Sequence, residues 1–126
     1  LWGKRIPKNQ ISMNDNGPYS SFVACNNNQE AYVIFNDNKR NYSDEGFFNG
    51  TPDNIQGLSL SYRKNAVAIV KINLENGALD RSVLFSKKDL SALVIPKQMH
   101  VDWKNMELLM YAINRNREKF GILSFK

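Results

Sequence analysis

The sequence predicts an all-β protein made of antiparallel hairpins, in a sandwich-like or propeller-blade-like arrangement. About seven to nine short runs of β-favouring residues recur at spacings of roughly eight to twelve residues. Polar turn clusters separate these runs, and the 17 asparagines of the chain supply many of the turns. Hydrophobic residues make up 42% of the 126 residues, which is enough to build the core of one domain.

The first predicted hairpin joins residues 19–25 to residues 30–36 through a polar cluster at 26–29. Its second run has two apolar faces, with Ala31, Val33 and Phe35 on one and Tyr32 and Ile34 on the other. A strand with two apolar faces is expected to be covered on both sides.

Residues 36–57 are polar and irregular, and we expect them to form the longest loop of the protein. The loop carries three candidate binding residues, Tyr42, Phe47 and Phe48. We expect Phe47 and Phe48 to anchor the loop on the body of the protein, and the alternative is an exposed contact. Tyr42 is predicted to be exposed, so that its ring is available to a ligand.

The second predicted hairpin joins residues 66–74 to residues 78–85 around the pair Asn76-Gly77. Asn and Gly both accept the positive φ angles of a type I′ turn, so this turn type is predicted here. The first run is apolar on both faces. The second run is expected to be half exposed, with Leu79, Arg81, Val83 and Phe85 on one face and Ala78, Asp80, Ser82 and Leu84 on the other.

The last third of the chain predicts four more strands. The first covers residues 92–96, where Pro96 closes the strand or sits on a sheet edge, and the second covers residues 98–103. In the second strand His100 is expected to face solvent or a neighbouring loop. Residues 107–114 and 119–125 are predicted to pair as the final two strands. A terminal helix over 107–114 is the alternative, since Leu, Met and Ala favour helices.

A succession of hairpin, loop and hairpin occurs twice, over about 1–62 and 63–126. Each half has the size of a four-stranded propeller blade. We therefore expect a single all-β unit that forms the C-terminal two blades of a larger protein. Two blades alone leave strand edges open and one blade face uncovered. A start at Leu1 without an initiator Met also predicts a removed leader or a longer parent protein.

Several stretches resemble the C-terminal third of large exported proteins of Bacteroidota-type bacteria, namely residues 2–10, 14–15, 19–22 and 32–38. Residues 67–77, 93–96 and 120–125 resemble the final blade and chain end of the same family. Those proteins are similar to β-propellers and are mostly uncharacterised. The resemblance implies an N-terminal part several blades long and a location in the cell envelope or outside the cell. It brings no catalytic motif.

The charge balance favours no particular polyanionic partner. The chain carries 17 Lys and Arg against 12 Asp and Glu, a net charge of +5. These basic residues are dispersed as singles and pairs, and no nucleic-acid-binding signature accompanies them, so no nucleic-acid partner is predicted. No apolar run approaches the roughly 18 residues of a membrane-spanning helix, so the chain is not expected to span a membrane.

The sequence predicts neither an enzyme nor a cofactor. His100 is the only histidine and Cys25 the only cysteine, which disfavours both a soft-ligand metal site and a nucleophile with its base. Asp15 and Asp37 stand among asparagines as in calcium loops, but the EF-hand spacing is absent, so turns are predicted. The glycines are scattered, and neither a nucleophile elbow nor a phosphate loop is present.

These observations predict a non-catalytic binding or scaffold module of an exported envelope protein, which contacts a protein partner or the missing N-terminal part of the same protein. The alternative is a self-contained carbohydrate-binding module that uses exposed aromatic rings. The rings that could present a face to a sugar or peptide are those of Trp2, Trp103, Tyr19, Tyr32, Tyr42, Tyr62 and Tyr111. The candidate binding residues of the module are Tyr42, Phe47, Phe48 and Trp103. That alternative requires an exposed tryptophan, whereas core packing is expected for most aromatic residues. A third possibility is that a missing part carries an active site which these strands support.

Overall fold

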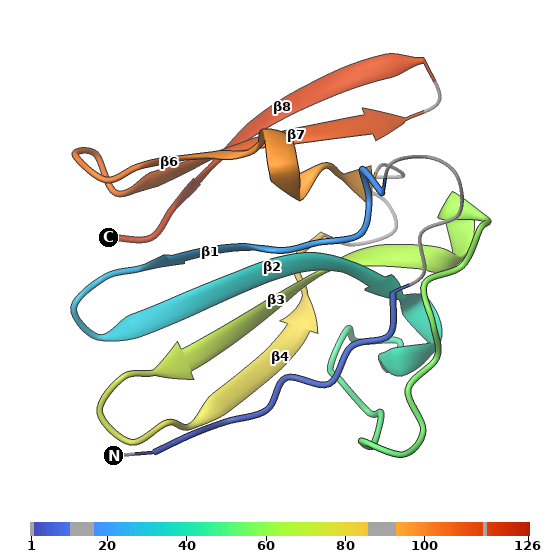
Figure 1. Cartoon of the computed structure of the whole chain (residues 1–126), viewed down its shortest axis with the longest axis horizontal. Helices are drawn as coiled ribbons and strands as arrows, with labels where there is room; N and C mark the ends of the chain where they lie inside the picture. Colours follow the sequence, from blue (N-terminus) through green and yellow to red (C-terminus); the bar gives the residue numbers. More distant parts are fainter. Residues whose placement is uncertain (1, 11–16, 86–92, 115) are drawn as a thin grey trace.

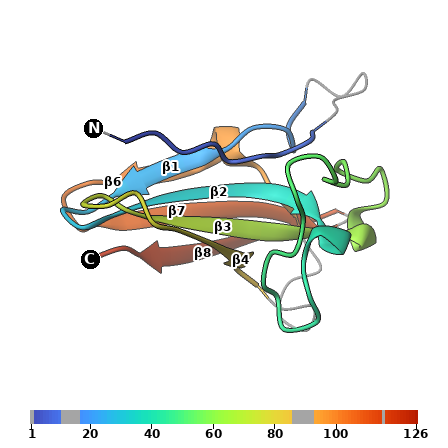
Figure 2. The same cartoon turned by 90° about the horizontal axis from the view of Figure 1, so that it is seen from below.

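Two antiparallel β-sheets pack face to face in this chain (Figure 1). The computed structural model describes residues 2–10, 17–85, 93–114 and 116–126. In these ranges the helical elements are three short 3-10 turns, η1 (Lys39–Asn41), η2 (Tyr62–Lys64) and η3 (Pro96–Gln98). The predicted all-β class is therefore confirmed, and the sandwich-like arrangement fits because the sheets do not close into a barrel. The strands of the two sheets run roughly along one direction (Figure 2), as in aligned sandwich packing.

The first sheet is a meander of four strands in chain order, each antiparallel to the next. Its strands are β1 (Val23–Asn26), β2 (Glu30–Asn38), β3 (Asn65–Asn73) and β4 (Leu79–Val83). Both predicted hairpins are confirmed. The first one is shorter than expected at its start, because β1 begins at Val23.

The expected start of the long loop at Asn36 is wrong. Asn36, Asp37 and Asn38 continue β2 and pair with Val67, Ala66 and Asn65 of β3. These polar side chains are buried and find partners there. The Asn36 amide donates to the carbonyl of Val94 (2.7 Å) and accepts from the Val94 N–H (3.1 Å), which ties the first sheet to the second. Asparagine thus supplies buried hydrogen bonds here as well as turns.

The second sheet is centred on β7 (Glu107–Asn114). β8 (Arg117–Ser124) pairs along one edge of β7, while β5 (Leu93–Val94) and β6 (His100–Asp102) share the other edge. Residues 107–114 are therefore a strand, as predicted, and not a helix. Only Ile95 separates β5 from Pro96, which opens the 3-10 turn Pro96–Gln98, so the strand is closed there as expected.

The core lies between the two sheets. One face of β2 and β3 packs there against β5 and β7; the buried residues are Cys25, Tyr32, Ile34, Val67, Ile69, Val94, Leu108, Met110, Ala112 and Phe125. A second cluster, on the opposite face of the first sheet, contains Phe35, Tyr42, Ala68 and Val70. The N-terminal segment and the loop after β2 lie on this side (Figure 1). Both central strands are therefore covered on both faces, as their sequences predict.

The turn between β3 and β4 differs from the prediction. Asn73 and Ala78 close a four-residue loop, in which the Gly77 N–H donates to the Asn73 carbonyl (2.8 Å). Gly77 has φ +70°, but Asn76 does not share the positive φ that a type I′ turn requires. The type I′ prediction is wrong because the Asn73 side chain caps a longer loop: its Oδ1 accepts from the N–H groups of Glu75 (2.9 Å) and Asn76 (3.2 Å).

The two sheets do not follow the expected division near residue 62. β1 to β4 share one sheet, so both hairpins belong to the same layer, and the second sheet begins at β5. The boundary between layers therefore falls between Val83 and Leu93. Membership of a longer propeller stays a prediction.

Candidate functional site

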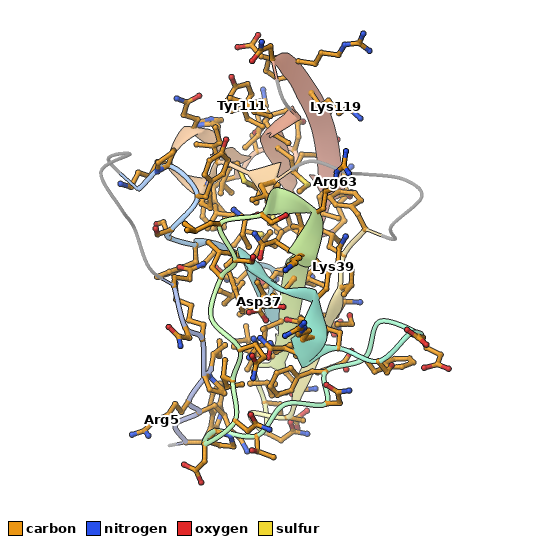
Figure 3. All side chains as sticks on the ribbon, turned by 90° about the vertical axis from the view of Figure 1, so that its right-hand side faces the viewer. Arg5, Asp37, Lys39, Arg63, Tyr111 and Lys119 are labelled. Atoms are coloured by element: carbon orange, nitrogen blue, oxygen red, sulfur yellow. The ribbon has the colours of Figure 1, made fainter. Side chains whose placement is uncertain are left out.

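The most concentrated group of polar side chains is a buried cluster on the first sheet. Arg81 of β4 and Asp37 of β2 form an ion pair of 2.6 Å, with side chains 2% and 1% exposed. The Tyr42 hydroxyl donates to the same Asp37 oxygen (2.6 Å) and accepts from Arg81 Nε (3.0 Å). The second Asp37 oxygen accepts from Asn41 Nδ2 (3.0 Å) and the Asn38 N–H (2.8 Å). Figure 3 places Asp37 in the interior of the molecule.

Aromatic rings enclose the Arg81 guanidinium. Its central carbon lies 4.0 Å from the centroid of Phe48 and 5.1 Å from that of Phe35. The Pro7 carbonyl accepts from Arg81 Nη1. Burial first, and then the charge and hydrogen bond of Asp37, raise the pKa of Tyr42 well above its usual value, which keeps the hydroxyl protonated. The cluster is closed to solvent and fully paired, so it fastens the loop and the N-terminal segment onto the sheet.

Sequence reasoning missed this cluster, although Arg81 gave a signal. Arg81 alternates with Leu79 and Val83 on one face of its strand, and a charge on a partly apolar face often has a buried partner. Asp37 gave no comparable signal, because its asparagine neighbours are equally typical of a turn.

The four predicted binding residues are not gathered into one site. Tyr42 is only 7% exposed, so the prediction that it offers its ring to solvent is wrong. Phe48 packs in the buried cluster and anchors the loop, as favoured, whereas Phe47 is exposed. Phe47 bridges to Ser82 of β4, while Trp103 packs edge-on against Phe125 (centroids 6.0 Å apart) in the turn after β6. The two exposed rings, of Phe47 and Trp103, therefore belong to different elements and do not form one site.

Both tryptophans are exposed, contrary to the expectation of core packing. Trp103 is 55% exposed and Trp2 is 40% exposed. The condition set by the carbohydrate-binding alternative, an exposed tryptophan, is met.

The outer face of the second sheet carries exposed apolar side chains, and we call it the open face: Leu109, Tyr111, Phe120 and Ile122. Leu109 lies opposite Ile122 and Tyr111 opposite Phe120 across β7 and β8, so all four side chains share one side of the sheet. Phe120 is 78% exposed and Ile122 is 66% exposed. Tyr111, labelled with Lys119 on the outlying β7–β8 hairpin in Figure 3, packs on Phe120 with ring centroids 5.2 Å apart. His100 of β6 pairs with Leu109 and is exposed, as expected.

Hydrogen bonding fixes the rim of the open face. The Tyr111 hydroxyl donates to Glu118 Oε1 (2.7 Å). That bond is the main reason why the pKa of Tyr111 is raised, so the phenol remains a donor.

Hollows lined by described residues open on the first sheet. One, of about 420 Å³, is lined by polar residues of the loop after β2. Another, of about 430 Å³, lies between the β1–β2 and β3–β4 turns.

The described residues hold no group of three or more His, Cys, Asp and Glu side chains placed to bind a metal ion. Cys25 is buried in the core, and burial raises the pKa of its thiol, which disfavours the reactive thiolate. Within the same described ranges, the chain has no helix with the length and apolar character needed to cross a membrane. Comparison with family models, with curated proteins and with solved structures finds no match to this chain.

Proposed function

We propose that this chain is a non-catalytic binding or scaffold module, which takes a protein partner on the open face and the adjoining free edge of β8. The observation that carries the proposal is the row of exposed apolar side chains beside an edge of β8 that none of the described strands pairs with. In keeping with the resemblance of the sequence, the module belongs to an exported protein of the cell envelope.

The open face has the chemistry of a contact surface. Phe120 and Ile122 are largely exposed and lie beside Leu109 and Tyr111, so the apolar area is continuous across two strands. A contiguous exposed apolar patch marks interaction sites more often than isolated apolar residues do. Aromatic residues are also enriched at the centres of protein interfaces.

The unpaired edge of β8 offers backbone N–H and C=O groups to which a partner strand can hydrogen-bond. Among the described strands, β8 pairs with β7 alone, over eight residues. At about 3.3 Å per residue this leaves an edge of roughly 26 Å, long enough for a partner strand to add to the sheet. The outer edge of β4 is occupied instead: the Phe48 N–H donates to the Arg81 carbonyl (3.1 Å), and the Val83 N–H donates to the Gly46 carbonyl (2.8 Å).

Charge on β8 indicates the composition of the partner strand. Arg117 and Lys119 point to the side opposite the open face, and no described acidic side chain forms an ion pair with either. A strand that adds to β8 therefore fits best with apolar residues beside Phe120 and Ile122 and acidic residues beside Arg117 and Lys119. Such a strand can come from another protein or from another part of the same protein.

Binding of two synthetic peptides tests this proposal. One alternates Val with Glu, and the other has Lys in place of each Glu. We expect the acidic peptide to bind the protein more tightly in a fluorescence anisotropy titration. The double charge reversal Arg117→Glu with Lys119→Glu should invert the preference, because the attraction then favours the basic peptide.

Variants distinguish specific binding at the open face from nonspecific binding to exposed apolar residues. Phe120→Ser with Ile122→Ser should abolish binding of the acidic peptide, since the apolar contact is lost while the charge of the protein is unchanged. The matched control is Leu60→Ser, which changes an apolar residue exposed elsewhere on the surface and should leave binding unchanged. Equal binding of both peptides, or equal losses in the open-face and Leu60 variants, would refute the proposal.

A further inference from the structure

A hollow lies at one end of the first sheet, between the β1–β2 turn and the β3–β4 turn. We call it the turn pocket. Its volume is about 430 Å³, and it is lined by Asn28, Gln29, Glu30, Asn73, Leu74 and Glu75. The two turns are joined by a hydrogen bond from the Leu74 N–H to the Gln29 carbonyl (2.9 Å). The walls of the pocket are therefore held at a fixed separation.

Trp2 stands beside the turn pocket as a fixed aromatic surface. Its Nε1 donates to the carbonyl of Leu74, a lining residue, at 3.3 Å. The indole ring lies over Gly77, where an added Cβ would come within 2.7 Å of two ring atoms. With 40% of its surface exposed, the ring is packed against glycine backbone on one side and open to solvent elsewhere.

The polar lining is partly preorganised and partly free. The Asn27 side chain accepts from the Gln29 N–H (2.8 Å) and the Glu30 N–H (2.7 Å), which sets the first turn. The Tyr32 hydroxyl donates to Glu30 Oε2 (2.5 Å), and burial together with this bond raises the pKa of Tyr32 to about 12. The Glu30 carboxylate is thereby held in place.

Other lining groups are available to a ligand. Within the described part of the chain, the side chains of Asn28, Gln29 and Glu75 form no hydrogen bond with other residues. Amides donate and accept, and carboxylates accept, so the set can bind several hydroxyl groups at once.

The geometry points to the turn pocket, with Trp2, as a binding site for a neutral saccharide. An exposed indole offers an apolar surface for the C–H face of a sugar ring, and the amides and carboxylates suit its hydroxyls. Glu30 and Glu75 repel acidic sugars, so neutral hexose units are the expected ligands. This site lies on a different sheet from the open face and does not depend on the proposed protein contact.

The two tryptophans of the chain permit a clean test. Trp103→Phe leaves Trp2 as the only tryptophan, and Trp2→Phe leaves Trp103. Neither ring lines the pocket, but Trp2 donates to the lining residue Leu74, whereas Trp103 packs on Phe125. Each variant is titrated with cellohexaose, laminarihexaose and mannohexaose, and with an alginate hexamer as the acidic control. We expect at least one neutral hexasaccharide to change the emission of Trp2 in Trp103→Phe, while the alginate hexamer does not.

Calorimetry then measures affinity for the sugar that responds. Trp2→Ala should weaken binding about tenfold or more, as expected for loss of an aromatic anchor, while Trp103→Ala should leave it unchanged. Asn28→Ala provides a second variant that preserves Trp2 and its packing on Gly77, and it should also weaken binding. The inference is overturned if none of the neutral sugars changes Trp2 emission, if alginate binds as well, or if Trp103→Ala weakens binding as much as Trp2→Ala.

Discussion

Replacing Asp37 by Asn tests whether the buried cluster fastens the molecule together. The change keeps the size of the side chain but removes the negative charge that faces Arg81 across 2.6 Å. It also replaces one acceptor oxygen by a donor among groups that all donate: Arg81, Tyr42, Asn41 and the Asn38 N–H. Because the Arg81 side chain is 2% exposed, its positive charge would be left buried without an opposite charge. Removing one member of a buried pair costs about 3 to 5 kcal/mol.

Urea unfolding at pH 7, followed by circular dichroism, measures this loss. For a chain of this size the same loss lowers Tm by about 10 to 20 °C. The matched control is Asp80→Asn, which removes an exposed carboxylate next to Arg81 on β4 and should change the free energy of unfolding by no more than about 0.5 kcal/mol. Replacing both partners, with Asp37→Leu and Arg81→Met, should recover part of the loss. Equal stability of Asp37→Asn and Asp80→Asn would show that the ion pair is not buried as described.

Three further predictions concern stability. Tyr42→Phe should cost about 1.5 to 3 kcal/mol at pH 7, because it removes a hydrogen bond to a charged group. Since the folded-state pKa of Tyr42 is raised, the stabilising effect of its protonated hydroxyl is present below the unfolded pKa near 10 and is lost as pH rises above it. Above pH 10, the difference in unfolding free energy between the wild type and Tyr42→Phe should therefore shrink by up to about 1.4 kcal/mol per pH unit. A difference that stays constant to pH 11.5 would contradict this. Gly77→Val should destabilise by about 1 to 2 kcal/mol or more and alter Trp2 fluorescence, because valine resists φ +70° and its Cβ meets the indole; a neutral effect on both readouts would exclude the contact. Ile69→Pro should cost about 3 kcal/mol or more, since it breaks the ladder of a strand paired on both sides, and an unchanged Tm would rule out the central position of β3.

Local patterns predicted most of the strands. Alternation of apolar residues on two faces correctly marked β2 and β3 as covered strands, and the short polar links correctly marked the hairpins. Errors occurred where a polar residue had a distant partner. Asn36 bonds to Val94, 58 residues away, and Arg81 bonds to Asp37, 44 residues away. Such pairings depend on the tertiary arrangement, and local propensity carries no information about them.

The candidate surfaces were harder to predict than the strands. Sequence alone shows that Leu109, Phe120 and Ile122 lie on strands, but coverage of their face depends on where the first sheet packs. The first sheet packs against Leu108, Met110 and Ala112, so the alternate residues of β7 remain outside. Trp2 becomes a pocket-side residue only because the N-terminal segment reaches Leu74, 72 residues along the chain. Tyr42 is likewise buried rather than exposed because its hydroxyl bonds to Asp37 and to Arg81, which is 39 residues away in the chain.

Hydrogen exchange of the backbone amides, with and without the acidic alternating peptide, tests the proposed binding surface most directly. We expect saturating peptide to slow exchange in Arg117–Ser124, the strand with the free edge. Exchange in Leu79–Val83, whose outer edge is already occupied by the loop, should stay the same. Unchanged exchange in β8 at saturation, or protection centred on the first sheet, would contradict the assignment of the partner to the open face and its edge.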